Sequence, residues 1–127
     1  MNQEIYDKGL EIRKAVVGAD YVERSLANAD AFTQPLQELV TQYCWGEVWG
    51  REGVVDRRTR SILNIGMLVA LNRPAELKLH VRGALINGLT EDEIRELVLQ
   101  AAIYCGVPAA LDASRVAREA IREYRDA

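Results

Sequence analysis

The sequence predicts an all-α fold, built as one compact domain of about seven helices over residues 1–127. Strand signals are missing, because no segment alternates apolar and polar residues over a sustained length and no Asn-Gly hairpin joins such segments. Glycine and proline fall instead at the ends and starts of helical stretches. The composition, 49% hydrophobic and 28% charged residues in a chain of 127, is that of one ordinary globular domain.

Three helices are predicted in the first part of the chain. The first covers about residues 2–17 and stops at Gly18, a residue type that suits the position after a helix end. The second is short, follows Asp20 and contains YVERSLANA. The third is capped by Thr33, has Pro35 in its first turn and carries PLQELVTQYCWGEVW.

Four more helices are predicted after the glycine-flanked loop GREGV. The fourth is capped by Asp56 and runs over about residues 57–71, and the fifth covers about residues 74–88. A capping box of the S/T-x-x-E type opens the sixth, which covers about residues 90–106. The seventh begins at a proline and covers about residues 108–127.

The fourth helix predicts a homo-oligomer. Its apolar residues do not fit a single stripe, and a helix that is apolar all round is buried all round. One small domain can hardly enclose it, so a partner subunit is expected to cover part of it. These apolar residues are Ile62, Leu63, Ile65, Met67, Leu68, Val69 and Leu71.

Charge and motif content narrow the function classes. A net charge of −3 and the absence of a basic run argue against nucleic acid as a partner. The N-terminus lacks the apolar stretch of a signal peptide, and the apolar window SILNIGMLVAL is too short to span a bilayer. We therefore expect a cytoplasmic protein with no membrane partner. GxGxxG, P-loop and metal-binding patterns are missing, so no cofactor is expected and an enzyme would rely on acid/base groups and arginines.

His80, the only histidine, is the first candidate for chemistry. Glu76 lies one helical turn before it, and the small residues Gly83 and Ala84 lie one turn after it, which leaves room for a neighbouring element or a ligand. One interpretation is a packing histidine that hydrogen-bonds Glu76. The other is a general acid or base, because imidazole titrates near neutral pH.

The motif DRRTR places Arg57, Arg58 and Arg60 at the start of the fourth helix. The helix dipole favours anions there, so three cations are locally out of place. They either pair with Glu52 and other nearby carboxylates at the surface or form a carboxylate-binding cluster. In the second case, the free N–H groups of the helix start and the arginine forks would hold a small di-anion together.

The segment YCWGEVWG places Glu47 between Trp45 and Trp49. Tryptophan beside a carboxyl group can remove it from water and raise its pKa, which turns the group into a proton donor near neutral pH. The alternative is a pair of packing tryptophans beside a solvated glutamate.

The turn YCGVPAA between the last two helices is a further candidate. Gly106 and Pro108 make a tight turn, and Tyr104 and Cys105 are expected to form one wall of a substrate pocket. The second cysteine, Cys44, lies far away in the sequence, and neither belongs to a CxxC or zinc pattern. Two reduced and partly buried thiols are therefore expected.

Four separate motifs, WGEVW, DRRTRS, LVALNRPAELKLHVRGALINGLTEDEI and YCGVPAA, follow one another in the order and nearly the spacing of γ-carboxymuconolactone decarboxylases. The chain resembles that family over almost its full length. The resemblance implies an all-helical fold of the alkylhydroperoxidase D type, assembled as a homo-hexamer, so we expect the oligomer to be a trimer or a hexamer. It also implies decarboxylation of 4-carboxymuconolactone to 3-oxoadipate enol-lactone in protocatechuate breakdown through the β-ketoadipate pathway.

The substrate of that reaction is an unsaturated lactone di-acid that supplies its own electron sink, so the chemistry needs no cofactor. We expect His80 to be the proton donor or the group that polarises the oxyanion, with Glu47 as its acid/base partner. The candidate substrate-binding residues are Trp45, Arg57, Arg58, Arg60, Tyr104 and Cys105.

Two departures bear on this assignment. Thiol peroxidases of the wider superfamily carry a CxxC pair before the matching histidine, and Arg73 and Glu76 occupy those places here, which argues against peroxidase chemistry. Leu111 stands where the decarboxylase pattern leads us to expect asparagine. Two alternatives therefore stay open: an isomerase or hydrolase of the same fold for another unsaturated lactone or keto-acid, and a non-catalytic oligomer that binds a small acid.

Overall fold

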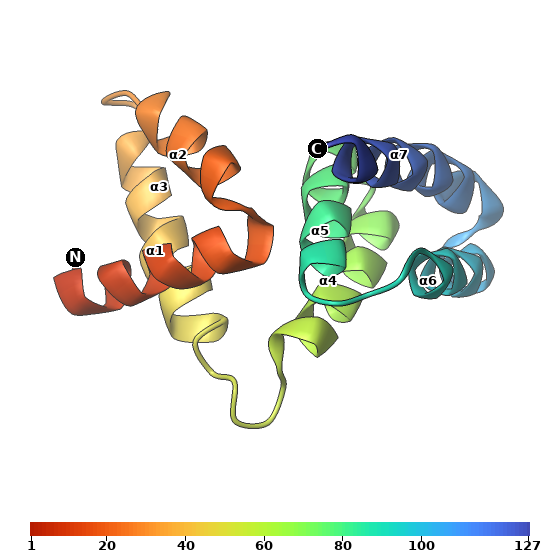
Figure 1. Cartoon of the computed structure of the whole chain (residues 1–127), viewed down its shortest axis with the longest axis horizontal. Coiled ribbons are helices and arrows are strands. Elements are labelled where there is room, and N and C mark those ends of the chain that lie inside the picture. The colour runs from red at the N-terminus through yellow and green to blue at the C-terminus, as the bar shows by residue number, and fades with distance from the viewer. The chain divides into compact units, whose positions relative to one another are not determined.

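The computed structural model describes all 127 residues and contains seven α-helices, one π-helical segment and no strand, which confirms the all-α class (Figure 1). The elements are α1 (Gln3–Val17), α2 (Ala19–Ala27), α3 (Gln34–Leu39), the π-helical η1 (Val40–Val48), α4 (Arg57–Leu71), α5 (Pro74–Ile86), α6 (Glu91–Cys105) and α7 (Val107–Asp126). The chain divides into two compact units, residues 1–57 and 58–127. The single domain expected from the sequence stays a prediction, and each unit has packing of its own.

Most predicted helix ends agree with the structure. Gly18 and Gly106 have φ angles of 102° and 101°, so both chain reversals use backbone conformations that favour glycine. The capping box of α6 is present: the backbone N–H of Glu93 donates to Thr90 Oγ1 at 3.1 Å, and the backbone N–H of Thr90 donates to Glu93 Oε1 at 3.0 Å. These contacts satisfy backbone donors that the first helical turn leaves without partners.

Two predicted helix starts need correction. Thr33 occupies the N-cap position of α3, but its side chain makes no capping hydrogen bond. Asp30 fixes this turn instead, since its Oδ1 accepts from the backbone N–H groups of Phe32 at 3.0 Å and of Thr33 at 2.9 Å. The second helix begins at Ala19, so Asp20 lies inside its first turn rather than before it.

The long third helix of the prediction is α3 continued by η1. The backbone N–H of Trp49 donates to the carbonyl oxygen of Cys44 at 2.9 Å, a π-type bond that spans five residues. The wider turn places Thr41, Trp45 and Trp49 in the interior of unit 1. The two indole rings pack against each other with centroids 4.9 Å apart. Hydrophobic periodicity does not distinguish this winding from an α-helix, so the sequence did not reveal it.

In unit 1, α1 crosses η1 at two glycines (Figure 1). A Cβ atom on Gly9 would lie 2.0 Å from the carbonyl oxygen of Thr41 and 2.8 Å from the backbone nitrogen of Gly46. A Cβ atom on Gly46 would lie 2.6 Å from the carbonyl oxygen of Ile5. The two backbones therefore approach so closely that neither position accepts a side chain.

Arg13 is buried in unit 1, a feature that sequence reasoning missed. Its Nη1 donates to Gln37 Oε1 at 3.0 Å and to Thr41 Oγ1 at 3.1 Å, which links α1 to α3 and η1. Burial disfavours the charged form and holds the pKa of this guanidinium below its ordinary value.

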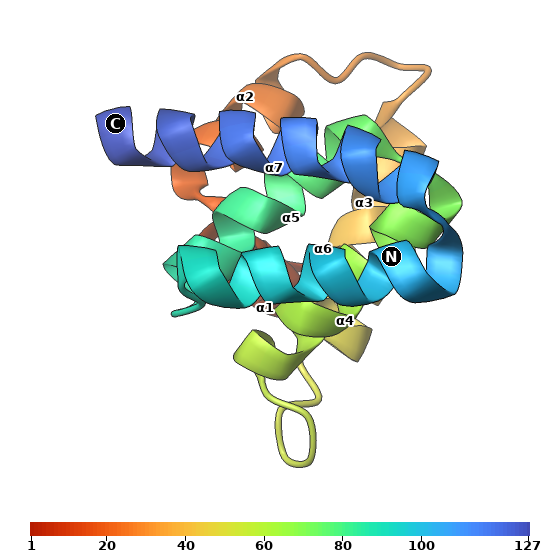
Figure 2. The ribbon, with the colours of Figure 1, turned by 90° about the vertical axis from the view of Figure 1, so that its right-hand side faces the viewer.

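Unit 2 has a continuous apolar core to which α4, α5, α6 and α7 all contribute. Helix α7 packs against both α5 and α6 (Figure 2). Its inner face is a row of small side chains, Ala110, Ala113, Ala117 and Ala120. Small side chains allow close approach of helices, and each alanine loses no rotamer freedom on burial.

Helix α4 is buried on one face only within this chain. Ile65 and Val69 lie in the core, whereas Leu63, Met67 and Leu71 are exposed. As the sequence predicted, the chain itself does not enclose α4 on all sides. Its outer face remains an apolar surface, which is the feature that motivates the proposed oligomer below.

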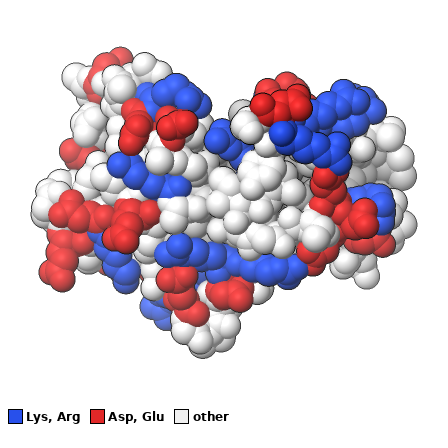
Figure 3. Space-filling view, viewed as in Figure 1, with Lys and Arg blue, Asp and Glu red and all other residues white.

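Charged side chains of both signs are interspersed over the face shown in Figure 3. None of the helices is both long and apolar enough to cross a bilayer.

Replacement of Gly9 by alanine should destabilise unit 1 strongly, because the added methyl group would overlap the backbone of η1. We expect Gly9→Ala to lose about 3 kcal/mol or more of unfolding free energy, the upper range for overpacking. Urea unfolding followed by circular dichroism measures this loss. The matched control is Gly53→Ala, where nothing lies within 4 Å, and its unfolding free energy should change by less than about 0.5 kcal/mol. Equal stability of the two variants would contradict the close crossing.

Candidate functional site

His80 lies in the middle of α5 and is half-buried. The apolar face of the helix, with Leu77, Val81 and Ala84, anchors α5 in the core and thereby fixes the position of the ring. Burial lowers the pKa of His80 to about 4, although the negative charge of Glu76 acts in the opposite direction. The imidazole is therefore neutral near pH 7, where it can donate one hydrogen bond and accept another but is not a protonated acid.

Asn64 on α4 is the neighbour of this ring that sequence reasoning missed. Its Nδ2 lies 3.4 Å from Nδ1 of His80, and both side chains are half-buried. A second polar pair joins the same two helices, since Nδ2 of Asn87 donates to Oγ of the buried Ser61 at 3.0 Å. The available signal was that Ser61 and Asn64 are the polar side chains inside the apolar run SILNIGMLVAL.

Two of the three arginines form ion pairs in this structure. Arg57 Nε lies 2.8 Å from Glu52 Oε1, as the surface-pairing interpretation predicted. Arg58 pairs with Glu93, the residue that completes the capping box of α6, and this contact holds the pKa of Glu93 below its ordinary value. The start of α4 is thereby linked to the start of α6, which the sequence did not predict.

Arg60 has a different place on α4. It is half-buried and precedes Asn64 by four residues, so the two side chains leave the same face of the helix one turn apart. Of the three arginines it is the one in closest helical register with the Asn64–His80 contact. This register places Arg60 one helical turn before Asn64, the residue that contacts His80.

Trp45 and Glu47 belong to unit 1 and differ in their surroundings. The ring of Trp45 is buried against Trp49, as a packing residue would be. Glu47 is exposed, so the desolvation expected from the two tryptophans is not found. The reason is local geometry: η1 directs both indoles inward and leaves the intervening glutamate on the outer side.

Tyr104 and Cys105 are exposed at the end of α6 and line a groove of about 450 Å³. The opposite wall is formed by α4, chiefly by Leu63, Gly66 and Met67. The groove is lined mainly by apolar side chains, and neither His80 nor any of the three candidate arginines lines it. Cys44 is half-buried as expected, whereas the exposure of Cys105 differs from the predicted partial burial.

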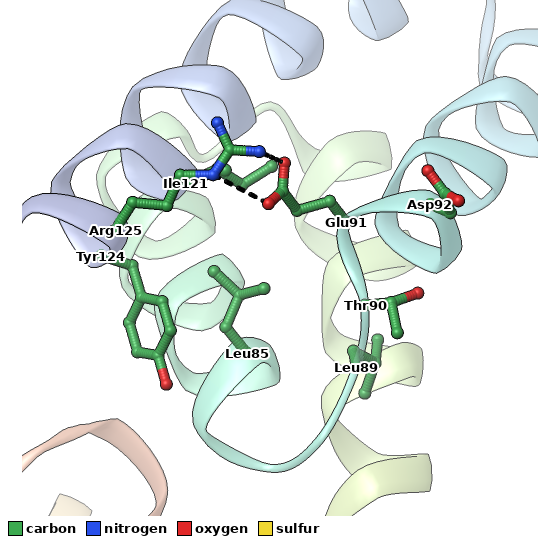
Figure 4. A pocket seen from close by; sticks show the side chains of 8 residues that line it. All are labelled: Leu85, Leu89, Thr90, Glu91, Asp92, Ile121, Tyr124 and Arg125. Atoms are coloured by element: carbon green, nitrogen blue, oxygen red, sulfur yellow. Dashed lines mark hydrogen bonds and ion pairs between the residues drawn. The ribbon is translucent and has the colours of Figure 1, made fainter.

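A second hollow, of about 730 Å³, lies where α6 begins and α7 ends (Figure 4). An ion pair between Glu91 and Arg125 spans it, with Arg125 Nε donating to Glu91 Oε2 at 2.9 Å. Asp92 also lines the hollow and pairs with Arg95, and the lining contains none of the predicted site residues. No group of three or more His, Cys, Asp or Glu side chains is arranged to hold a metal ion.

Comparison with known proteins adds two kinds of match. Residues 34–119 match the model of the carboxymuconolactone decarboxylase family. A nitrosuccinic acid decarboxylase from Metarhizium robertsii is 46% identical over 126 residues, which is 99% of this chain and 87% of that protein. A 4-carboxymuconolactone decarboxylase from Acinetobacter baylyi is 41% identical over 122 residues, which is 96% of this chain and 90% of that protein.

The family match runs from α3 to α7 and so includes every candidate residue described above. Both relatives are named as decarboxylases, and each is matched over most of its length. The chain therefore belongs to the carboxymuconolactone decarboxylase family and is a carboxy-lyase.

Proposed function

We propose that the chain decarboxylates a small di-acid whose own unsaturated or electron-poor group accepts the electrons that CO₂ leaves behind. The first candidate substrate is 4-carboxymuconolactone, with 3-oxoadipate enol-lactone as the product, in protocatechuate breakdown. The observation that carries this proposal is a half-buried, neutral histidine on α5 that contacts Asn64 on α4, in a chain that is 41% identical to a 4-carboxymuconolactone decarboxylase.

The chemistry follows from the substrate. The bond between the ring carbon and its carboxylate carbon breaks, CO₂ leaves, and the electron pair moves through the C=C bond to the lactone carbonyl oxygen. The resulting dienolate then takes a proton on carbon. The protein must bind the carboxylates, stabilise the developing oxyanion and allow that proton transfer.

Each task has a candidate residue. Arg60 is the first candidate for carboxylate binding because of its register with His80, and an arginine fork matches a carboxylate in two places. Arg57 and Arg58 could take part by exchanging Glu52 and Glu93 for a substrate carboxylate. A neutral His80 suits the oxyanion better than it suits the role of a protonated acid.

Nitrosuccinate is a second candidate substrate, favoured by the 46% identity to a nitrosuccinic acid decarboxylase. It too carries two carboxylates. Loss of CO₂ from the carbon that bears the nitro group places the electron pair on the nitro oxygens, in the same way as a lactone carbonyl accepts it. The two candidates therefore need the same protein groups: a cation for the retained carboxylate and a donor for the new oxyanion. Leu111, which is exposed on α7, stands where the 4-carboxymuconolactone decarboxylase pattern leads us to expect asparagine. This departure keeps a substrate other than 4-carboxymuconolactone open.

The outer face of α4 and α6 also supports the expected homo-oligomer. Leu63 and Met67 are 56% and 44% exposed, and Ile103 and Tyr104 are 79% and 82% exposed. An apolar surface of this kind on a small chain is typical of a subunit contact. We propose that a second copy of the chain covers it.

Purified protein should release one CO₂ per molecule of 4-carboxymuconolactone or nitrosuccinate, and the better substrate is the one with the higher kcat/KM. Absorbance change and CO₂ release measured in parallel provide the readout. Succinate, which has no electron sink, should release none. His80→Ala should lower kcat on the better substrate by about 100- to 1000-fold, the cost of losing one oxyanion donor. Turnover of neither di-acid by the folded protein would rule out the proposed substrate class.

The low pKa of His80 should also appear as a pH dependence of stability. The unfolded chain binds a proton at this residue near its ordinary pKa of 6.5, and the folded chain does so only near 4. Acidification within that interval therefore favours unfolding, and the contribution is fully present above pH 6.5. Between about pH 7 and about pH 5 the loss should be about 2 kcal/mol. Urea unfolding at both values measures it, and His80→Gln should lack this component; an identical pH dependence in both proteins would contradict a neutral buried ring.

The oligomer should be detectable by light scattering at micromolar concentration, with a mass several times the 14.2 kDa of one chain. Leu63→Glu should reduce the mass toward that of one chain, because it places a charge in the apolar contact. Val54→Glu is the matched control, since Val54 is 98% exposed in the loop before α4 and should leave the mass unchanged. A wild-type mass of 14.2 kDa would exclude the oligomer.

A further inference from the structure

The contact between Asn64 and His80 bears on which ring nitrogen carries the proton. Nδ2 of Asn64 lies 3.4 Å from Nδ1 of His80. An amide nitrogen carries two hydrogens and can only donate, so with the amide in this orientation Nδ1 is the acceptor. A neutral imidazole that accepts at Nδ1 has its single proton on Nε2.

The surroundings of this contact hold it in place. Asn64 and His80 are both half-buried, which limits the freedom of both side chains. Helix α5 is anchored by buried Leu77 and Val81 on either side of His80 in sequence, so the ring has little freedom to rotate with the helix. A contact of 3.4 Å is long for a hydrogen bond, and such contacts at active sites commonly tighten when substrate binds.

We propose that Asn64 is a positioning residue: it donates to Nδ1 of His80, fixes the ring as the tautomer with its proton on Nε2, and so makes Nε2–H the donor to the oxyanion formed on decarboxylation. This inference rests on the proposed function, and it assigns one of the two roles left open for His80. The histidine stabilises the negative oxygen and keeps its proton throughout. The proton that reaches carbon comes from water or from a carboxylic acid.

The two possible roles of His80, oxyanion donor and proton donor to carbon, require different neighbours at position 64. A histidine that delivers a proton to carbon must first become an imidazolium, with both nitrogens protonated, and would then face the N–H of Asn64 with a second donor. A carboxylate in place of the amide would favour that form, because it accepts from Nδ1–H and stabilises the positive ring. Asn64→Asp therefore separates the two roles while the size of the side chain is nearly unchanged.

Because His80 is the only histidine, ¹⁵N-labelled histidine gives a single imidazole spectrum that needs no assignment. In the wild-type protein we expect Nδ1 without a proton and Nε2 with one. At about pH 8.5, where the ring stays neutral in the variant as well, Asn64→Asp should reverse this pattern. With the better di-acid, its kcat should fall by about 100-fold or more while KM changes little.

Asn64→Ala removes the donor without reversing the pattern, so both tautomers should be seen and kcat should fall by about 10- to 100-fold. Ser61→Ala is the matched control. It breaks the other polar pair between α4 and α5, and it should leave the tautomer of His80 and kcat nearly unchanged. Circular dichroism establishes that each variant is folded. If Asn64→Asp does not fold, the wild-type spectrum and Asn64→Ala decide the question.

A wild-type spectrum with the proton on Nδ1 would overturn the inference, whatever the activity of the protein. So would an Asn64→Asp variant that keeps a third or more of wild-type kcat at about pH 8.5 with its tautomer reversed. Failure of the proposed function has a different signature, because the wild-type protein would then turn over neither di-acid while its imidazole spectrum still showed the proton on Nε2.

Discussion

Close packing of helices through very small residues is the constraint on which both units depend. In unit 1 the backbones of α1 and η1 meet at Gly9 and Gly46, where a Cβ atom would overlap the opposing chain. In unit 2 the same requirement is met by the alanines that α7 presents to its neighbours. These positions contribute little apolar area themselves. Their effect is to bring larger side chains such as Ile65 and Val81 close enough to be fully enclosed, so that a chain of modest size has a dense core.

The packing of that core determines the protonation state of His80 in the candidate site. A histidine on a solvated helix would be partly protonated near pH 7, whereas the anchoring of α5 takes His80 out of water and keeps it neutral. Neutrality limits what the ring can do, but it makes the ring a stable hydrogen-bond donor whose state does not change over the physiological range. Decarboxylation of a di-acid with an internal electron sink requires such a hydrogen-bond donor, because the charge to be stabilised is negative and appears on oxygen.

The sequence predicted the features that depend on local signals. Glycine and proline placed the helix ends, and Thr90 with Glu93 predicted a capping box that the structure contains. Features that depend on three-dimensional contacts were missed: the π-helical winding around Trp45, the burial of Arg13, the Arg58–Glu93 pair and the approach of Asn64 to His80. None of these has a spacing that marks it in one dimension. The polarity of Asn64 within an apolar helix was the nearest available signal, and it gains meaning only when α5 is placed beside α4.

The winding of η1 has a consequence for how this part of the chain can diverge. A π-helical segment holds extra residues for the length that it spans, so its neighbours are in phase only while its residue count is kept. A one-residue deletion between Thr41 and Trp49 that kept this winding would change the phase of the residues after it relative to those before it. One tryptophan would then leave the interior and Glu47 would turn toward it. Relatives that retain this arrangement are therefore expected to differ here by substitution, while gaps in their alignments fall in the loops on either side.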